Sequence, residues 1–300
     1  MKKFELTSET KINIFGKKLF RIKALISFAD VEAGETGGWV EKEGNVNQSG
    51  NAWVYGDAMV SGNAIVYGDA KVSGNAKVSG NAEVYGNAEV SDNAKVYGDA
   101  EVSGDAWVSD NAKVYGNAKV SGNAKVSGNA EVSGDAEVYG NAKVYGNAEV
   151  SGNAEVSGDA WVSVNAKVSG NAWVSDNALV YGNTKVSGNA EVSGNAEVSG
   201  DAWVSDNAKV YGNAEVYGNA EVSGDAEVYG NADYTTIHGF GTQFRTTTFF
   251  RCKDKKVRVA CGCFFGTIPE FREQVKNTRK GKIAEEYLMI ADLMENHFEK

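Results

Sequence analysis

The sequence predicts an all-β solenoid, in which the chain coils repeatedly and each short strand pairs with its copy one coil later. Two observations predict this fold. Val recurs every six residues from Val54 to Val228, at all 30 positions, and the residue two before it is Ala at 29 of them. The repeat Asn/Asp-Ala-x-Val-Ser/Tyr-Gly runs from Asn51 to Ala232 without insertion or deletion. Self-similarity at a fixed period is typical of solenoids.

Each hexad predicts a short strand followed by a bend. Alternate side chains of a strand face opposite sides, so Ala and Val point inward and x, mostly Lys, Glu or Trp, points outward. Gly followed by Asn or Asp favours a turn. The Gly position also holds Asp92, Asp110, Asp176, Asp206 and Val164. Because a β-branched residue rarely adopts positive φ, we expect the left-handed residue at the Asn/Asp position instead.

Hexads of this kind resemble the left-handed β-helix, in which three hexads form one triangular coil. The resemblance implies a left-handed parallel β-helix of about ten 18-residue coils over residues 49–232. Neighbouring coils would satisfy all backbone hydrogen-bonding groups. Each buried Val contributes about 1.5 kcal/mol or more, which the cost of ordering the chain largely offsets. Stability therefore requires many coils with both ends sealed.

Residues 1–48 predict a small N-terminal β cap. The segments 11–15 and 18–26 are expected to form a hairpin around Gly16-Lys17, because Phe20, Ile22, Ala24 and Ile26 alternate with other residues as in a strand. The stretch Gly37-Gly38-Trp39 then leads toward the first coil.

Residues 233–300 predict a C-terminal α+β module. The segments 246–251 and 256–261 favour two strands joined at 253–255. Thr267-Ile268-Pro269-Glu270 is a capping box that opens a helix. A second helix is expected from about Ile283 to Phe298, with Tyr287, Ala291, Met294 and Phe298 on one face.

The charge is uneven along the chain. Residues 49–232 carry 10 Lys and 24 Asp plus Glu, a net charge of -14, whereas residues 1–48 carry +1 and residues 233–300 carry +3. An acidic solenoid disfavours direct contact with nucleic acid or anionic lipid. The chain has no apolar run long enough to span a membrane and no apolar signal-peptide core at its start, so we expect no membrane contact. Three Cys favour a reducing, cytoplasmic location.

Three stretches give the chain its resemblance to a known family. They are 19–25 with Asp30-Val31 and 37–41, the repeated Gly-Asn-Ala-x-Val, and 261–271 (Cys-Gly-Cys-Phe-Phe-Gly-Thr-Ile-Pro-Glu-Phe). With these, the chain resembles the YdcK-like hexapeptide-repeat proteins of bacteria, phages and prophages. The resemblance implies the fold and a mobile-element origin, and it implies no reaction.

Catalytic and metal-binding patterns are weak. Many left-handed β-helix proteins are acyltransferases that use a catalytic His and a loop that projects from a coil. Residues 51–232 contain no His and no such loop. His238 with Cys252, Cys261 and Cys263 could be interpreted as a metal site. Cys261 and Cys263 flank one Gly in an expected strand and would share a face, where free Cys packs as a small core residue, and Cys-x2-Cys pairs are absent. We expect no catalytic residue, cofactor or metal, while the role of these four residues stays open.

The outward Trp residues are the candidate partner-binding residues. Trp53, Trp107 and Trp161 recur at intervals of nine hexads, three whole coils, so they are expected on one face. Trp173 and Trp203 are expected on the other two faces. Such an aromatic stripe would suit a protein partner or a second copy of the chain, and duplication of near-identical hexads is the alternative explanation.

Three functions are compatible with these patterns. The leading hypothesis is a non-catalytic structural scaffold that presents its faces or its C-terminal module to a protein partner, host-encoded if the gene is phage-borne, with self-association as a further option. The first alternative is an acidic nucleic-acid mimic that inhibits a host defence protein. The second alternative is an acyltransferase-like enzyme.

Overall fold

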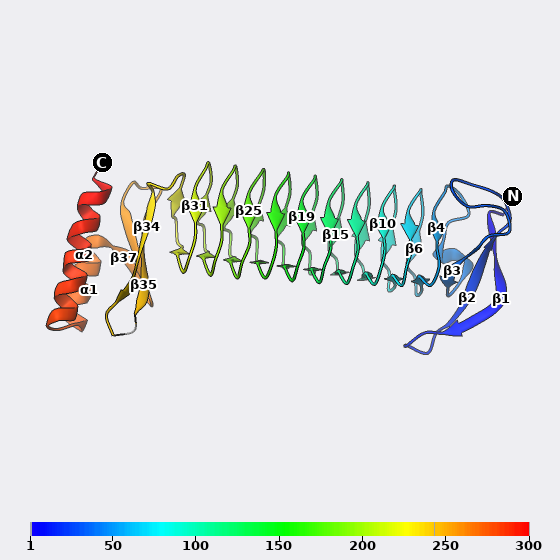
Figure 1. Ribbon diagram of the computed structural model, residues 1–300, viewed down its shortest axis with the longest axis horizontal. Helices are drawn as coiled ribbons and strands as arrows, with labels where there is room; N and C mark the ends of the chain where they lie inside the picture. The colour runs from blue at the N-terminus through cyan, green and yellow to red at the C-terminus, as the bar shows by residue number, and fades with distance from the viewer. Residues whose placement is uncertain (1, 243, 300) are drawn as a thin grey trace. The chain divides into compact units, whose positions relative to one another are not determined.

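The computed structural model of the protein describes residues 2–242 and 244–299 (Figure 1). The chain forms two compact units, Met1–Val164 and Asn165–Lys300. Both units contain parallel β-solenoid turns in which each strand pairs with the strand three hexads later. The predicted solenoid is therefore confirmed, with an antiparallel region at its start and a module of antiparallel sheet and helix at its end. The domain boundaries at residues 48 and 232 stay a prediction.

The N-terminal region contains the predicted hairpin and joins the solenoid directly. The predicted first strand, 11–15, is wrong, because that strand ends at Ile12 and the turn begins at Asn13. Strands β1 (Phe4–Ile12) and β2 (Lys18–Ala24) pair in antiparallel fashion. Strand β3 (Thr36–Val40) pairs antiparallel to β2 and parallel to β5 (Met59–Val60). Because β3 belongs to both arrangements, the cap continues one solenoid sheet instead of sitting on its end.

The hexads of the first unit form three sheets of short strands. The cap sheet continues from β3 and β5 through β8 (Lys77–Val78), β11 (Lys95–Gly98), β14 (Lys113–Gly116), β17 (Glu131–Val132) and β20 (Glu149–Val150). The tryptophan sheet contains β4 (Trp53–Val54), β7 (Lys71–Val72), β10 (Glu89–Val90), β13 (Trp107–Val108), β16 (Lys125–Val126), β19 (Lys143–Val144) and β22 (Trp161–Val162). The glutamate sheet contains β6 (Ile65–Val66), β9 (Glu83–Val84), β12 (Glu101–Val102), β15 (Lys119–Val120), β18 (Glu137–Val138) and β21 (Glu155–Val156).

The solenoid core consists of the repeated Ala and Val side chains. The 30 Val residues at the Val position of the repeat, from Val54 to Val228, are all 0% exposed, and Thr184 occupies its Ala position at 0% exposure. The first turn is longer than the others, because Val40 pairs with Val60 and Val46 with Val66. Within the short helix η1 (Glu43–Asn45), the buried Asn45 amide donates to the carbonyls of Gly62 (3.2 Å) and Ala64 (2.8 Å). Asn45 thereby adapts the irregular first turn to the repeat.

The expected position of the left-handed residue is wrong. Positive φ occurs at the Gly position, and the non-Gly residues there adopt it as well, including Asp110 (φ 58) and Val164 (φ 65). Backbone crowding explains the preference for Gly, since a Cβ at Gly128 would lie 2.9 Å from the backbone N of Gly146, one turn later. The position after the Gly position always holds Asn or Asp for a different reason, because these side chains form a ladder of hydrogen bonds.

The ladder runs along the exposed corners of the solenoid. Asn93 Nδ2 donates to Asn111 Oδ1 (3.3 Å), and Asn111 Nδ2 donates to Asn129 Oδ1 (3.1 Å). Asp can only accept, and Asn81 donates in this way to Asp99 (2.7 Å). No Asp in this position is followed by another Asp three hexads later, so no two carboxylates are stacked directly within this ladder.

The second unit contains further turns of the same kind. Its three groups of paired strands are β23 (Lys167–Val168), β26 (Lys185–Val186), β29 (Trp203–Val204) and β32 (Glu221–Val222); β24 (Trp173–Val174), β27 (Glu191–Val192), β30 (Lys209–Val210) and β33 (Glu227–Val228); and β25 (Leu179–Val180), β28 (Glu197–Val198) and β31 (Glu215–Val216).

A four-stranded antiparallel sheet and two helices complete the second unit. The sheet order is β34 (Tyr234–Phe240), β35 (Arg245–Arg251), β36 (Val257–Cys261) and β37 (Phe264–Thr267), followed by α1 (Ile268–Thr278) and α2 (Lys282–Phe298). The central strand pair, the Thr267–Glu270 capping box and the buried face of α2 confirm the predictions. Strands β34 and β37 were not predicted from the sequence. Backbone N–H of Glu221 donates to Thr248 Oγ1 (2.9 Å), which ties the module to the last turns of this unit.

Candidate protein-binding surface

Trp53 is not part of any exposed surface. It is 0% exposed, and its indole packs edge-on against Phe4 (ring centroids 5.9 Å apart) and Phe28 (5.4 Å) of the N-terminal region. The prediction of Trp53 as a partner-binding residue is therefore wrong. Its outward direction was predicted correctly, but the cap covers this position of the first turn.

Trp107 and Trp161 lie on the tryptophan sheet and are 42% and 39% exposed. Lys125 and Lys143 occupy the two positions between them, and all four residues pair in register. Lys125 Nζ lies 5.4 Å from the Trp107 ring centroid, and Lys143 Nζ lies 4.4 Å from that of Trp161. We call these four residues the tryptophan–lysine stripe. Each ring is paired with a cation at a distance typical of cation–π interaction.

Neighbouring side chains hold both indoles of the stripe. Trp107 Nε1 donates to Ser91 Oγ (3.1 Å), and the Trp161 ring meets Tyr145 edge-on at 6.0 Å. In both pairs, the residue after one Val contacts the outward residue 16 positions later. The same spacing joins Tyr85 OH to Glu101 Oε2 (3.3 Å). This diagonal contact was not predicted from the sequence, because the 18-residue period alone indicates only which residues stack one coil apart.

The exposed Trp residues share a sequence feature that could have identified them as a group. Each of the four begins Trp-Val-Ser and then has Asp or Val where Gly is usual, whereas Trp53 is followed by Val-Tyr-Gly. The Ser two positions later is nearly buried in every case, as Ser109, Ser163, Ser175 and Ser205. Because residues two apart in a strand face the same side, a Tyr there would compete with the indole for space.

The two Trp residues of the second unit do not form a stripe with each other. Trp173 and Trp203 are both 45% exposed and lie on different sheets. Trp203 Nε1 donates to Ser187 Oγ (3.1 Å), and its side chain lines a cavity of about 360 Å³ with Asp206, Glu221 and Phe265. Burial, and secondarily Asp206, raises the pKa of Glu221 in this cavity.

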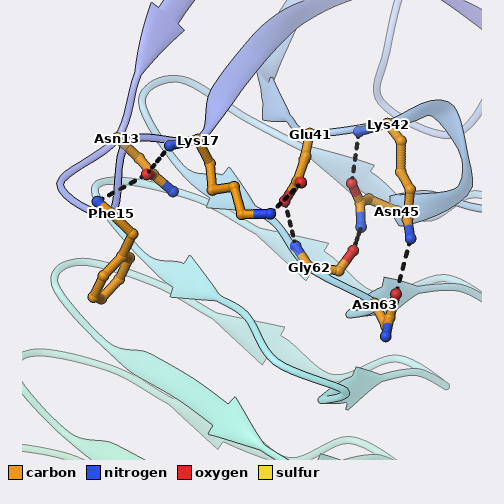
Figure 2. Close-up of polar contacts among 8 residues, drawn as sticks. All are labelled: Asn13, Phe15, Lys17, Glu41, Lys42, Asn45, Gly62 and Asn63. Atoms are coloured by element: carbon orange, nitrogen blue, oxygen red, sulfur yellow. Dashed lines mark hydrogen bonds and ion pairs between the residues drawn. The ribbon is translucent and has the colours of Figure 1, made fainter.

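The tip of the N-terminal hairpin is a second exposed apolar feature, with Ile14 80% and Phe15 74% exposed. Figure 2 shows that Asn13 Oδ1 accepts hydrogen bonds from the backbone N–H groups of Phe15 (2.9 Å) and Lys17 (3.0 Å).

Glu41 attaches this turn to the solenoid of the first unit. It pairs with Lys17 (3.1 Å) and accepts from the backbone N–H of Gly62 (2.7 Å), and the latter bond is the main cause that lowers the pKa of Glu41 (Figure 2).

The His and Cys residues of the C-terminal module were the candidates for a metal site. Among the residues that the structure describes, no three His, Cys, Asp or Glu side chains are arranged to hold a metal ion. Cys252 is buried, which raises the pKa of its thiol to about 11, while Cys263 is exposed. Cys261 and Cys263 flank a turn, because Gly262 has φ 63. The expectation that both lie in one strand is therefore wrong.

Comparison with known proteins supports the nature of the repeat. Residues 52–68 match the family model described as the YdcK beta solenoid repeat. The match covers one stretch near the start of the solenoid, so the chain is similar to that family in its repeat. No match was found among the curated proteins. Within residues 2–242 and 244–299, no helix has both the length and the apolar character needed to cross a membrane.

Proposed function

We propose that the protein is a non-catalytic cytoplasmic scaffold that binds a protein partner through the tryptophan–lysine stripe. The observation that carries the proposal is the register of Trp107, Lys125, Lys143 and Trp161, in which two exposed indoles are held by neighbouring side chains. Trp is the residue most enriched in binding hot spots, and a ring that is already oriented loses little entropy on binding. Resemblance to YdcK-like proteins supports a phage or prophage source and a host-encoded partner.

The geometry of the stripe defines the partner's chemistry. Three turns separate the two Trp residues, which corresponds to about 14 Å at the usual spacing of paired strands. The two ammonium groups between the rings favour carboxylates. The partner should therefore present two apolar pockets about 14 Å apart with acidic groups between them.

A matched pair of double variants tests the proposal by affinity purification from the native host. Trp107→Ser with Trp161→Ser removes both indoles. Glu101→Gln with Glu155→Gln changes two residues that are likewise three turns apart, in the same hexad position, on the glutamate sheet. We expect the Trp variant to lose the partner and the Glu variant to retain it.

Deletion of one hexad tests whether binding requires the alignment of the two Trp residues, in a protein that should still fold. Removal of residues 131–136 keeps the repeat continuous but moves Trp161 into the column of the glutamate sheet, away from Trp107. Because the hexads are nearly equivalent, circular dichroism should show a folded solenoid, while partner binding should be lost. Retained binding would contradict a stripe that acts as one surface.

The acidic-mimic alternative is favoured by one observation, which is the outward composition of the glutamate sheet. Glu83, Glu101, Glu137 and Glu155 line it, with Lys119 as the cation among them. If the Glu double variant loses the partner, duplex DNA competes for that partner and the Trp variant still binds, the mimic is the correct function.

A further inference from the structure

A cavity of about 300 Å³ lies in the C-terminal module, between the turn joining β36 and β37 and the C-terminal end of α1. Its apolar wall comes from Phe264, Phe271, Val275 and Tyr287. The ring centroids of Phe264 and Phe271 lie 5.4 Å apart, and those of Phe271 and Tyr287 lie 5.9 Å apart. The buried members of this wall belong to the module's hydrophobic core, which fixes the shape of the cavity.

The rim of the cavity is cationic. Arg279 lines it, and its Nη1 donates to the Thr278 carbonyl at 3.3 Å. Among the described residues, no carboxylate lies within ion-pair distance of this guanidinium, whereas Arg272 on α1 binds Asp292 and Glu295. Residues 274–284 contain four cations and no acidic residue. These charges offset the negative end of the α1 dipole, which would otherwise repel an anion here.

We propose that this cavity binds a small organic anion with a flat apolar body. The body packs against Phe264 and Phe271, and the anionic group accepts hydrogen bonds from Arg279. A volume of about 300 Å³ is at the lower end for small-molecule sites, and an apolar wall with few convergent polar groups is their usual construction. Gln274 and Thr278 also line the cavity and supply neutral polar contacts for orientation.

The fluorescent anion 8-anilino-1-naphthalenesulfonate, which has an aromatic body and a sulfonate, tests the site in the full chain. Its fluorescence should rise on binding with saturation. Arg279→Gln should weaken binding about ten-fold or more, the loss expected for one hydrogen bond to a charged group. Lys276→Gln is the matched control, because Lys276 is an exposed cation in the last turn of α1 that does not line the cavity. This variant should bind the probe like the wild type.

A second variant tests the cavity without removing charge. Thr278 is exposed, so Thr278→Trp should leave the fold intact while its indole fills the space. We expect probe binding to be abolished. Unchanged affinity in both Arg279→Gln and Thr278→Trp, or equal weakening by Lys276→Gln, would overturn the proposal.

The thiols provide a readout independent of fluorescence. Cys263 lines the cavity and is exposed, whereas Cys252 is buried elsewhere with a raised thiol pKa. The bound probe should slow alkylation of Cys263 by iodoacetamide in the wild type but not in Thr278→Trp. Cys252, whose thiolate is scarce at neutral pH, serves as the unreactive internal reference. Equal alkylation with and without probe would overturn binding at this cavity.

Discussion

In the Met1–Val164 unit, the same hexad position is buried in the first turn and exposed in the middle turns. Trp53 and Trp107 occupy the same hexad position on the same sheet. Phe4 and Phe28 pack against Trp53, which is completely buried, while Trp107 is 42% exposed beside Lys125. The repeat therefore decides the direction of a side chain, and residues outside the repeat decide whether solvent reaches it.

The two regions also differ in how they use cations. In the middle turns Lys125 lies on the surface over an indole. In the first turn Lys3 is 2% exposed, and its Nζ donates to the carbonyls of Ala52 (2.8 Å) and Gly50 (3.3 Å). These carbonyls belong to the first coil, where the regular pairing between coils has no preceding turn. Lys3 thus replaces the backbone donors that the middle turns receive from their neighbours.

The largest expected effect is the loss of the Trp53 side chain. Trp53→Ala should lower the free energy of unfolding by about 3–5 kcal/mol, the usual cost of emptying a buried aromatic site. Trp107→Ala is the matched control and should cost less than about 1 kcal/mol, because its ring is half exposed. Chemical denaturation followed by circular dichroism measures both values.

Equal costs at the two positions would contradict the comparison. Trp53→Phe refines it, because the buried Trp53 Nε1 has no hydrogen-bond partner among the described residues. Since Phe keeps most of the apolar contact and removes this donor, it should destabilise the protein less than Ala does.

Lys3 gives the second prediction, a pH dependence of the capped first turn. Burial lowers the pKa of Lys3 from 10.5 to about 8, partly offset by Asp69. Between these values the unfolded chain binds a proton that the folded chain does not, so stability rises with pH. From pH 8 to pH 10 the free energy of opening the cap should increase by about 2 kcal/mol. Hydrogen–deuterium exchange of β1 measures it.

Two variants show whether Lys3 is the source. Lys3→Met removes the titrating amine and should remove most of the rise, and Lys11, whose pKa burial also lowers, accounts for the remainder. Lys2→Met removes an exposed lysine that pairs with Glu43 and should leave it unchanged. The prediction is limited to pH values below 10 because of two tyrosines. Burial raises the pKa of Tyr55 and Tyr67 above the ordinary 10.0. Above pH 10 the unfolded chain therefore loses tyrosine protons that the folded chain keeps, and stability falls. A rise of undiminished size in Lys3→Met would assign it to another group.

Features that the repeat determines could be predicted from the sequence, whereas features that depend on contacts between distant residues could not. Thirty evenly spaced Val residues were sufficient for the solenoid, and the interval of nine hexads correctly placed Trp107 and Trp161 on one sheet. The burial of Trp53 depends on Phe4 and Phe28, whose proximity no periodic pattern reveals. Strands β34 and β37 lack a periodic signal, and the cavity beside Arg279 is formed by loops and helix ends that only the folded module brings together.

The smallest expected effect on stability is at Val164, a residue for which positive φ was not expected. It holds φ 65 at the Gly position, which costs a β-branched residue about 1–3 kcal/mol. Val164→Gly relieves this strain but adds unfolded-state entropy, so the net stabilisation should be about 1 kcal/mol.

Asp110 is the matched control. Its carboxylate accepts from the backbone N–H of Gly128 (2.9 Å), so Asp110→Gly exchanges a hydrogen bond for relief of strain and should change stability by less than about 0.5 kcal/mol. Thermal unfolding of both variants tests this difference, and a destabilised Val164→Gly would mean that the exposed Val side chain makes contacts worth more than its strained backbone costs.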